Sequence, residues 1–357
     1  MSITSRVTLR GQRSDDWEYL TALFSRPEVI AATDELPYMA DDVFRERYTG
    51  STPDGHNLIG EISLPSGRKR FVGLAHMRVS PQRQRHAGRL LFVPHPDYYG
   101  TETEENFLAQ VLQFATDWLA LQRVQVIVCT QDARVQTLYE QHGFVPEATL
   151  HRYIFRQGDY RDARVLAWLP NAPQTDAPEQ AFSPLELAPA DTGSVSVRAA
   201  EADDADAVAE VWAVGSAEVS PHYTPYRSRA ATRQTLENLG ADQRVLVAEA
   251  AEKVAGVAEL RLHEGRRAHS AELTLTVTPE AAPAVQEALL ATALELGENW
   301  LQITRTVAYV YADQPQQAGW WMAHGFEAEG TLRHAAYRAG QMVDLVVLAR
   351  LREETTP

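Results

Sequence analysis

Residues 137–169 read TLYEQHGFVPEATLHRYIFRQGDYRDARVLAWL, and residues 319–351 read GWWMAHGFEAEGTLRHAAYRAGQMVDLVVLARL. The HGF motif at 142–144 returns at 324–326, with no gap between the two aligned segments. A self-similarity with one fixed, long period indicates a repeated structural unit. Because this period is as long as an ordinary domain, we expect a duplicated domain rather than a solenoid of short repeats.

The chain length agrees with two domains. A chain of 357 residues is long for one hydrophobic core and suits two. A stretch rich in proline, alanine and acidic residues separates the two copies, and such a composition predicts an extended linker. We therefore expect an N-terminal domain over residues 1–170, a linker over 171–194 and a C-terminal domain over 195–357.

Composition excludes several classes of function. The net charge of −15 argues against binding to nucleic acid or to an anionic membrane, since both are bound mainly through clustered lysine and arginine. An acidic protein is compatible with a cationic acceptor such as an amine. The single cysteine, Cys129, rules out a disulfide within the chain, and no apolar run is long enough to span a membrane. We expect a cytoplasmic protein without a metal site.

Hydrophobic periodicity predicts the same elements in both halves. In order, these are a short strand (7–10 and 195–198), an apolar helix with an acidic start, two strands, a long amphipathic helix, a further strand, a short helix that ends at a glycine, and a β-hairpin. The predicted positions are strands 71–79, 89–93 and 124–130 with a helix within 106–122, and strands 254–262, 272–277 and 305–311 with a helix within 284–302. Gly143 and Gly325 suit the left-handed position after a helix, and Gly158 and Gly340 suit hairpin turns. Each half is therefore predicted to be α+β, with a mixed sheet.

Two segments carry a resemblance to a known family. LYEQHGF at 138–144 and HGFEAEGTLR at 324–333 resemble the closing segment of the GCN5-related N-acetyltransferase (GNAT) superfamily. The resemblance covers nearly all of residues 5–169 and 195–351. It implies two GNAT-like acyl-CoA N-acyltransferase domains in tandem, and direct transfer of an acetyl group from acetyl-CoA to an amine.

The same resemblance identifies a loop that would hold the pyrophosphate of acetyl-CoA. Such loops use glycines and a helix N-terminus, because backbone N–H groups and the helix dipole favour an anion. The matching cofactor-binding residues are Pro96, Tyr98, Tyr99, Gly100, Thr101, Glu102, Thr103 and Glu104. The two phosphate-facing glycines of the family fall on Glu102 and Glu104, where a carboxylate repels a pyrophosphate. In the second half the corresponding segment, 277–290, contains no glycine, and its Pro283 lacks an N–H. The sequence thus implies acetyl-CoA as co-substrate together with poor pyrophosphate sites.

Two residues of the first half are candidate catalytic groups under the resemblance. Tyr139 holds the position of the general acid that protonates the leaving thiolate, and the second half has Trp321 there, which cannot serve as an acid. His76, on a predicted strand, is a candidate base for the amine. Both also have ordinary structural interpretations, as a packed helix aromatic and as a hydrogen-bonding strand residue.

The leading hypothesis is an acetyltransferase whose N-terminal domain is the active unit. The alternative is a non-catalytic binding or scaffold protein in which both coenzyme sites have degenerated. A third possibility, compatible with both, is an intramolecular pseudo-dimer of the two domains with a shared acceptor cleft, in a monomer or a homodimer. The acceptor would be a small amine or the amine of a peptide or protein. By analogy with the family, the segment Ile30–Asn57 would line its site, with Tyr38, Asp41, Asp42, Glu46 and Tyr48.

Overall fold

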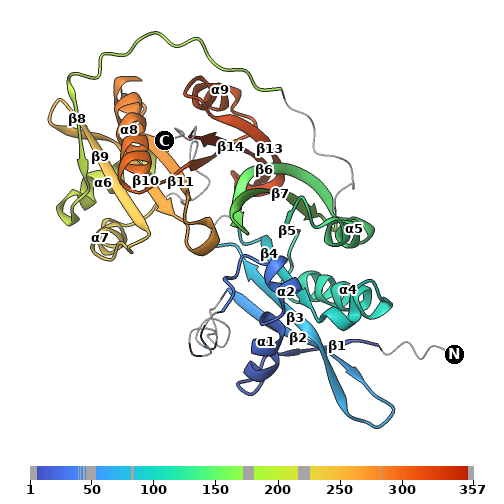
Figure 1. Ribbon diagram of the computed structural model, residues 1–357. Helices are drawn as coiled ribbons and strands as arrows, with labels where there is room; N and C mark the ends of the chain where they lie inside the picture. Colours follow the sequence, from blue (N-terminus) through green and yellow to red (C-terminus); the bar gives the residue numbers. More distant parts are fainter. Residues whose placement is uncertain are drawn as a thin grey trace. The chain divides into compact units, whose positions relative to one another are not determined.

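The computed structural model describes residues 6–38, 40, 42, 45, 54–81, 84–171, 181–215, 226–281 and 283–352. The chain divides into two compact units, Met1–Ala177 (unit 1) and Pro178–Pro357 (unit 2). Figure 1 colours their elements along the chain. Much of the segment expected to line the acceptor site, including Asp41, Glu46 and Tyr48, lies outside the described residues.

Unit 1 is built on a mixed sheet with the strand order β1-β2-β3-β4-β5-β7-β6. The strands are β1 Thr8–Gly11, β2 Gly55–Ser63, β3 Lys69–Val79, β4 Ala87–Pro94, β5 Arg123–Cys129, β6 Val145–Arg156 and β7 Asp159–Trp168. The helices are α1 Trp17–Phe24, α2 Pro27–Ala31, the 3-10 turn η2 Pro96–Tyr98, α4 Glu102–Asp117 and α5 Ala133–Gln141. Strands β4 and β5 pair in parallel, whereas their described neighbours pair antiparallel.

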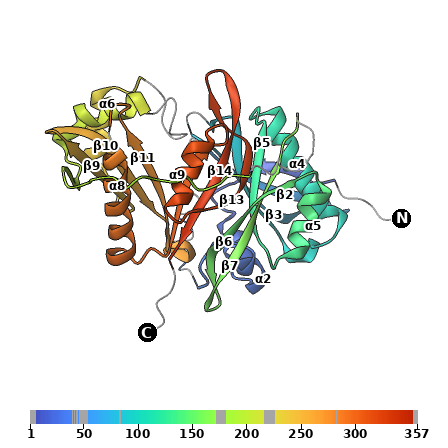
Figure 2. The ribbon, with the colours of Figure 1, turned by 90° about the horizontal axis from the view of Figure 1, so that it is seen from above.

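Side-chain alternation along the strands gives the sheet of unit 1 two covered faces. Leu58 and Ala75 pack with Phe107 and the rest of the apolar stripe of α4 in one core cluster. Ile59 and Leu74, their chain neighbours, pack with Leu20, Leu23 and Phe24 of α1 and with Val29 of α2 in another. Figures 1 and 2 both show α4 and α5 side by side in unit 1. The long helix is thus packed on one face of the sheet, and the short helices α1 and α2 on the other.

Unit 2 repeats this plan with the strand order β13-β14-β12-β11-β10-β9-β8. Its strands are β8 Val195–Ala199, β9 Gln243–Ala250, β10 Lys253–Leu262, β11 Ser270–Val277, β12 Arg305–Tyr311, β13 Glu327–Arg338 and β14 Gln341–Leu351. Its helices are α6 Ala205–Gly215, α7 Arg229–Glu237, α8 Pro283–Glu295 and α9 Pro315–Ala323, with short 3-10 turns at Ala202–Asp204 and Gly265–Arg267 and a π-helical turn at Leu296–Trp300. Helix α8 packs across β9, β10 and β11, as can be followed in Figure 2. The α+β class with a mixed sheet, predicted from the sequence, is confirmed in both units.

The predicted glycine positions are confirmed as well. Gly143 and Gly325 follow their helices at φ +83° and +80°, and Gly158 and Gly340 turn their hairpins at φ +82°. An L side chain is strained in this left-handed region, which explains why glycine occurs at all four positions. Strands β2 and β9 were not predicted; each pairs with a neighbouring strand along its full length.

One buried ion pair lies at the same position in each unit. Arg123 of β5 contacts Glu147 of β6 at 2.7 Å, with 1% and 0% of their side-chain surfaces exposed. In unit 2, Arg305 of β12 contacts Glu329 of β13 at 2.6 Å, with 2% exposed on each side. Buried charges are tolerated only when they are paired. The repeat therefore extends from the sequence motifs to an internal electrostatic contact.

Within the described residues, no helix combines the length and the apolar character needed to cross a membrane.

Candidate active site

The candidate site of unit 1 begins where strands β4 and β5 separate. Their parallel pairing covers only three registers, from Ala87 opposite Arg123 to Arg89 opposite Gln125. Beyond it, Leu90–Pro94 of β4 and Val126–Val128 of β5 line a cavity of about 50 Å³. Strands that part in this way expose backbone N–H and C=O groups to a ligand that runs between them.

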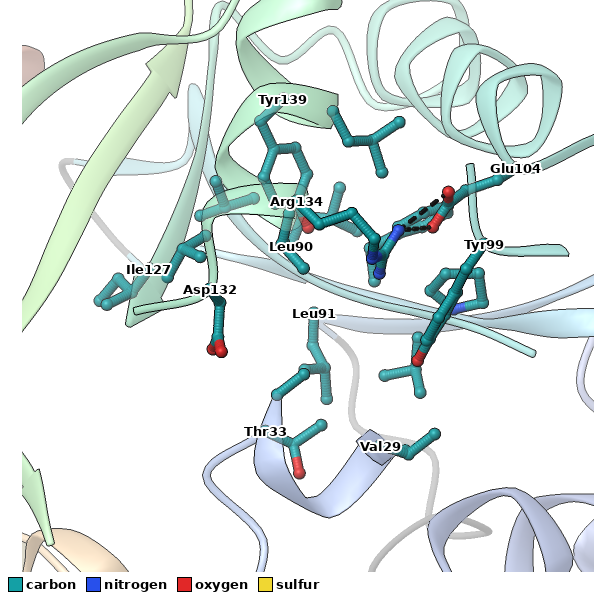
Figure 3. Close-up of a pocket in the computed structure, with 18 residues that line it drawn as sticks. Val29, Thr33, Leu90, Leu91, Tyr99, Glu104, Ile127, Asp132, Arg134 and Tyr139 are labelled. Atoms are coloured by element: carbon teal, nitrogen blue, oxygen red, sulfur yellow. Dashed lines mark hydrogen bonds and ion pairs between the residues drawn. The ribbon is translucent and has the colours of Figure 1, made fainter. Parts of the chain in front are cut away.

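This space, here called the inner cavity, is closed by residues from three further segments. Val29 belongs to α2, and Thr33 lies two residues beyond that helix. Tyr99 belongs to the loop before α4, and Leu138 and Tyr139 belong to α5. Figure 3 shows Val29, Thr33, Tyr99 and Tyr139 around the cavity, together with Leu90 and Leu91. The walls are mainly apolar with a few polar groups, as is usual for small-molecule sites.

A second space of about 330 Å³, here called the outer groove, lies over the N-terminal end of α4 and along α5. It is lined by Gly100, Glu104, Glu105, Arg134, Thr137, Leu138 and Gln141. Glu104, Arg134 and Leu138 also line the inner cavity. The Glu104–Arg134 ion pair therefore lies at the boundary between the two spaces, and Figure 3 marks it with dashed lines.

Glu104 is held by several hydrogen bonds although it belongs to the first turn of a helix. Arg134 Nη1 lies 2.7 Å from Glu104 Oε1 and 3.0 Å from Oε2. The backbone N–H of Gly100 donates to Glu104 Oε2 at 2.7 Å. Glu104 is 1% exposed, whereas Glu102 is exposed in the same turn. The two glutamates that align with family glycines therefore differ: Glu102 is exposed, and Glu104 is buried and hydrogen-bonded.

Tyr99 packs against Arg134, the other partner of the Glu104–Arg134 ion pair. The guanidinium carbon of Arg134 lies 3.8 Å from the centroid of the Tyr99 ring, a close cation–π contact. Burial raises the pKa of Tyr99 to about 12, so its phenol stays neutral at physiological pH. Arg134 is thus placed between an aromatic face and a carboxylate.

Tyr139, the predicted general acid, lies in the wall of the inner cavity. It is 3% exposed, and its ring packs 5.0 Å from that of Phe144. Burial raises the pKa of Tyr139, and the charge of nearby Glu104 raises it further. The hydroxyl therefore keeps its proton at neutral pH, as a proton donor must.

His76, the predicted base, is not among the described residues that line the inner cavity. It lies opposite Leu91 in the β3–β4 register, on the sheet face that α1 and α2 cover. Its Nδ1 is 2.5 Å from Asn57 Oδ1, so Nδ1 donates and Nε2 carries the lone pair. Burial lowers the pKa of His76, with Arg78 and His56 adding repulsion, and the ring is neutral at pH 7. His76 has the protonation state of a base but stands outside the cavity wall.

The remaining residues of the predicted phosphate loop serve local structure. Pro96 begins the turn η2, and Tyr98 is buried in the core cluster under α4. Thr101 is the residue before α4, and its hydroxyl donates to the carbonyl of Tyr98 at 2.6 Å. Thr103 follows in the first turn, half-buried. Their roles in cofactor binding stay predictions.

The loop does not fit a pyrophosphate in this conformation. The N–H of Gly100 already donates to a carboxylate, and the Arg134 side chain is paired with the same group. A phosphate brought to this place would meet the negative charge of Glu104, and like charges about 4 Å apart repel by roughly 1 kcal/mol in water and about 4 kcal/mol at a surface-like dielectric.

Sequence reasoning missed Arg134 and Asp132. Asp132, the residue before α5, lines the inner cavity and lies 3.3 Å from Arg156 of β6. Figure 3 shows its carboxylate on the opposite side of the view from Glu104. Asp132 precedes α5 and Arg134 lies in its first turn, just after the end of β5. This place between a strand and a helix was the one signal that the sequence offered. Asp132 supplies the inner cavity with a second carboxylate, which Arg156 neutralises in part.

In unit 2 the chain's own residues cover the place that corresponds to the outer groove. Gly319 aligns with Thr137, and its carbonyl accepts the N–H of Leu185 at 3.0 Å. A Cβ at Gly319 would lie 2.7 Å from the carbonyl oxygen of Ser183. Phe182 packs against the core of unit 2. Part of the predicted linker is therefore packed on α9, and glycine at 319 makes room for it.

The aromatic pair of α9 is structural. Trp320 and Trp321 are 9% and 6% exposed, and the Trp321 ring lies 4.7 Å from that of Phe326. Trp321 thus repeats the packing of Tyr139 on Phe144 without an acidic hydroxyl. Unit 1 alone has the predicted proton donor at this position.

Known proteins similar to this chain are N-acetyltransferases. The chain is 23% identical over 166 residues to the L-amino acid N-acetyltransferase AaaT of Escherichia coli (strain K12), a match that covers 46% of the chain and 98% of the relative. It is 23% identical over 162 residues to the spermidine N(1)-acetyltransferase of Vibrio cholerae serotype O1, covering 45% of the chain and 92% of the relative. No protein-family model matches the chain.

Solved structures of the same kind are also similar. One is the crystal structure of spermidine N-acetyltransferase from Vibrio cholerae in complex with CoA and spermine, with a TM-score of 0.42, 20% identity, and coverage of 46% of the chain and 95% of that structure. Another is the acetyltransferase of GNAT family from Streptococcus pneumoniae, with a TM-score of 0.40, 19% identity, and coverage of 44% and 99%. The predicted resemblance to GNAT N-acetyltransferases is thus confirmed by the curated relatives over just under half of the chain. The duplication as a whole stays a prediction.

Proposed function

We propose that the chain is an N-acetyltransferase that acetylates a small amine, and that unit 1 carries the active site. The observation that carries this proposal is the Tyr139 hydroxyl in the wall of the inner cavity, where β4 and β5 separate. The two curated relatives, an amino-acid and a spermidine N-acetyltransferase, support a small amine as acceptor. The domain boundaries, the pseudo-dimer and the cytoplasmic location remain predictions.

Acetyl transfer from a thioester to an amine makes one bond and breaks another. The carbon–nitrogen bond forms, the carbon–sulfur bond breaks, the amine nitrogen loses a proton and the sulfur gains one. Tyr139 is proposed to supply the proton at its hydroxyl, because burial keeps the phenol neutral. Acetyl-CoA, implied by the resemblance, is the first donor to assay, although the phosphate loop as it stands does not fit its pyrophosphate.

The acceptor is proposed to enter from the side of α2. Thr33, two residues beyond α2, and Asp132, the residue before α5, are polar residues of the cavity wall, and a carboxylate beside the cavity favours a protonated amine as it binds. His76 lies on the same sheet face as Leu91, and its neutral ring is proposed to accept the amine proton through intervening solvent. His76 is thus the proposed base on the acceptor side, and Tyr139 is the proposed acid on the donor side.

The test is an assay of thiol release together with the mass of the product. The purified chain is incubated with acetyl-CoA and a panel of amines that includes L-amino acids and polyamines. We expect release of one thiol for each acetylated amine, with an acceptor preference. If no amine in the panel is acetylated above the background of heat-denatured protein, the proposed function is wrong, and the alternative of a binding protein takes its place.

A further inference from the structure

The side chain of Glu104 occupies the N-terminal end of α4 in the way a bound anion would. Backbone N–H groups at a helix start, a glycine with positive φ and an arginine are the elements with which proteins hold phosphates. In unit 1 a glycine at φ +69°, Gly100, donates its N–H to the Glu104 carboxylate, and Arg134 donates to both carboxylate oxygens. The donors expected to face a ligand therefore face the protein's own carboxylate.

Three features hold this arrangement in place. The Glu104 side chain is 1% exposed, so it has little freedom to move into solvent. Tyr99 covers the face of the Arg134 guanidinium at 3.8 Å. Both Glu104 and Arg134 line the inner cavity and the outer groove, so the pair lies between the two spaces. A donor that reached the inner cavity past this pair would find the anion position filled.

From these contacts we propose that Glu104 takes the place of a ligand phosphate in unit 1, so that the site recognises its acetyl thioester donor without a pyrophosphate contact. The inference rests on the proposed acetyl transfer, because it concerns how that same site selects its donor. The recognised part of the donor is then the short amide-containing thioester arm, which can run between the separated strands β4 and β5. Glu104 is in this view a specificity-determining residue, and Arg134 positions it.

The first consequence concerns the unmodified protein. Acetyl-CoA and acetyl-pantetheine, which lacks the pyrophosphate and the nucleotide, are expected to have KM values within about threefold of each other, since the contact that distinguishes them is absent. A preference for acetyl-CoA of tenfold or more would overturn the inference.

The second consequence is a gain of binding on substitution. Replacing Glu104 with Ala frees the Gly100 N–H and Nη1 of Arg134, and it removes the repelling charge. Charge-assisted hydrogen bonds of this kind correspond to a change in affinity of at least about tenfold. By calorimetry, the Glu104→Ala chain is expected to bind CoA at least about tenfold more tightly than the unmodified chain, and to bind pantetheine with little change.

Two further variants isolate the cause. Glu140→Ala removes the same charge from an exposed position on α5 and is expected to leave both affinities unchanged. Glu104→Gln keeps the side-chain volume and an acceptor for the Gly100 N–H, so it is expected to tighten CoA binding less than Glu104→Ala does. The Arg134 side chain is 41% exposed, so its unpaired charge remains solvated and the alanine variant is expected to fold. A thermal melt confirms folding before each titration.

The outcomes separate this inference from the proposed function. Equal CoA affinity in the Glu104→Ala and unmodified chains, or an equal gain for CoA and pantetheine, would overturn the role of Glu104 even if the unmodified chain acetylates amines. A selective gain for CoA supports the role of Glu104 even if no acceptor in the panel is acetylated.

Discussion

The buried ion pair of unit 2 gives a stability prediction whose size follows from the structure. Glu329 contacts Arg305 through two short hydrogen bonds, 2.7 and 2.6 Å, and both side chains are 2% exposed. Replacing Glu329 with Gln leaves a buried guanidinium without its counter-charge. Removing one partner of such a pair costs about 3–5 kcal/mol, which is a large part of the roughly 5–15 kcal/mol that stabilises an ordinary domain.

The assay is urea unfolding followed by tryptophan fluorescence, with the midpoint and the slope of the transition fitted separately. Asp206→Asn is the matched control, because Asp206 pairs with Arg229 at 3.3 Å with both side chains more than half exposed, and exposed pairs contribute about 0–1 kcal/mol. The double variant Arg305→Met/Glu329→Leu is expected to recover most of the lost stability, since it removes both charges. A Glu329→Gln variant no less stable than the Asp206→Asn control would refute the reasoning.

Two further predictions concern other parts of the chain. Burial lowers the pKa of His76, so the folded ring is neutral above pH 6.5, and the unfolded chain takes up the proton first as pH falls. If the neutral ring is the base, kcat/KM is expected to decline only below pH 6.5. In His76→Asn this decline at acid pH is expected to be lost, and turnover is expected to be about a hundredfold slower. An unchanged profile in His76→Asn would remove His76 from the mechanism. In unit 2, Gly319→Val is expected to displace Ser183 from α9 and to destabilise the unit by about 1–3 kcal/mol, measured by thermal unfolding, because its Cβ would meet the Ser183 carbonyl oxygen at 2.7 Å. Equal melting temperatures for Gly319→Val and the unmodified chain would show that the packed linker contributes nothing.

The elements that the sequence predicted are those whose cause is local. Gly143 and Gly158 were identifiable because a left-handed residue after a helix and a hairpin turn each favour glycine within a few positions. The Glu104–Arg134 ion pair could not be identified from the sequence, because its partners lie 30 residues apart and belong to two different helices. Neither residue type nor spacing records such a contact, which arises only when α4 and α5 are placed beside each other.

Only the part of the candidate site that belongs to a local sequence motif was predicted. Tyr139 stood in a motif of consecutive residues, and the structure places it in the wall of the inner cavity. Glu102 and Glu104 looked alike in sequence, as two acidic residues of a first helical turn, yet one is exposed and the other is buried. Burial depends on the packing of the whole unit, so the sequence could not separate them.

The central claim is that unit 1, through Tyr139, transfers an acetyl group to an amine. The most direct measurement compares the rate of acetylated-amine formation, by mass spectrometry, in the unmodified chain, in Tyr139→Phe and in Trp321→Phe, the equivalent change in unit 2. Phenylalanine keeps the ring packed on Phe144, so the fold is preserved while the proton donor is lost. The account predicts a fall of about a hundredfold or more in Tyr139→Phe and an unchanged rate in Trp321→Phe; equal rates in all three chains, or a loss confined to Trp321→Phe, would contradict it.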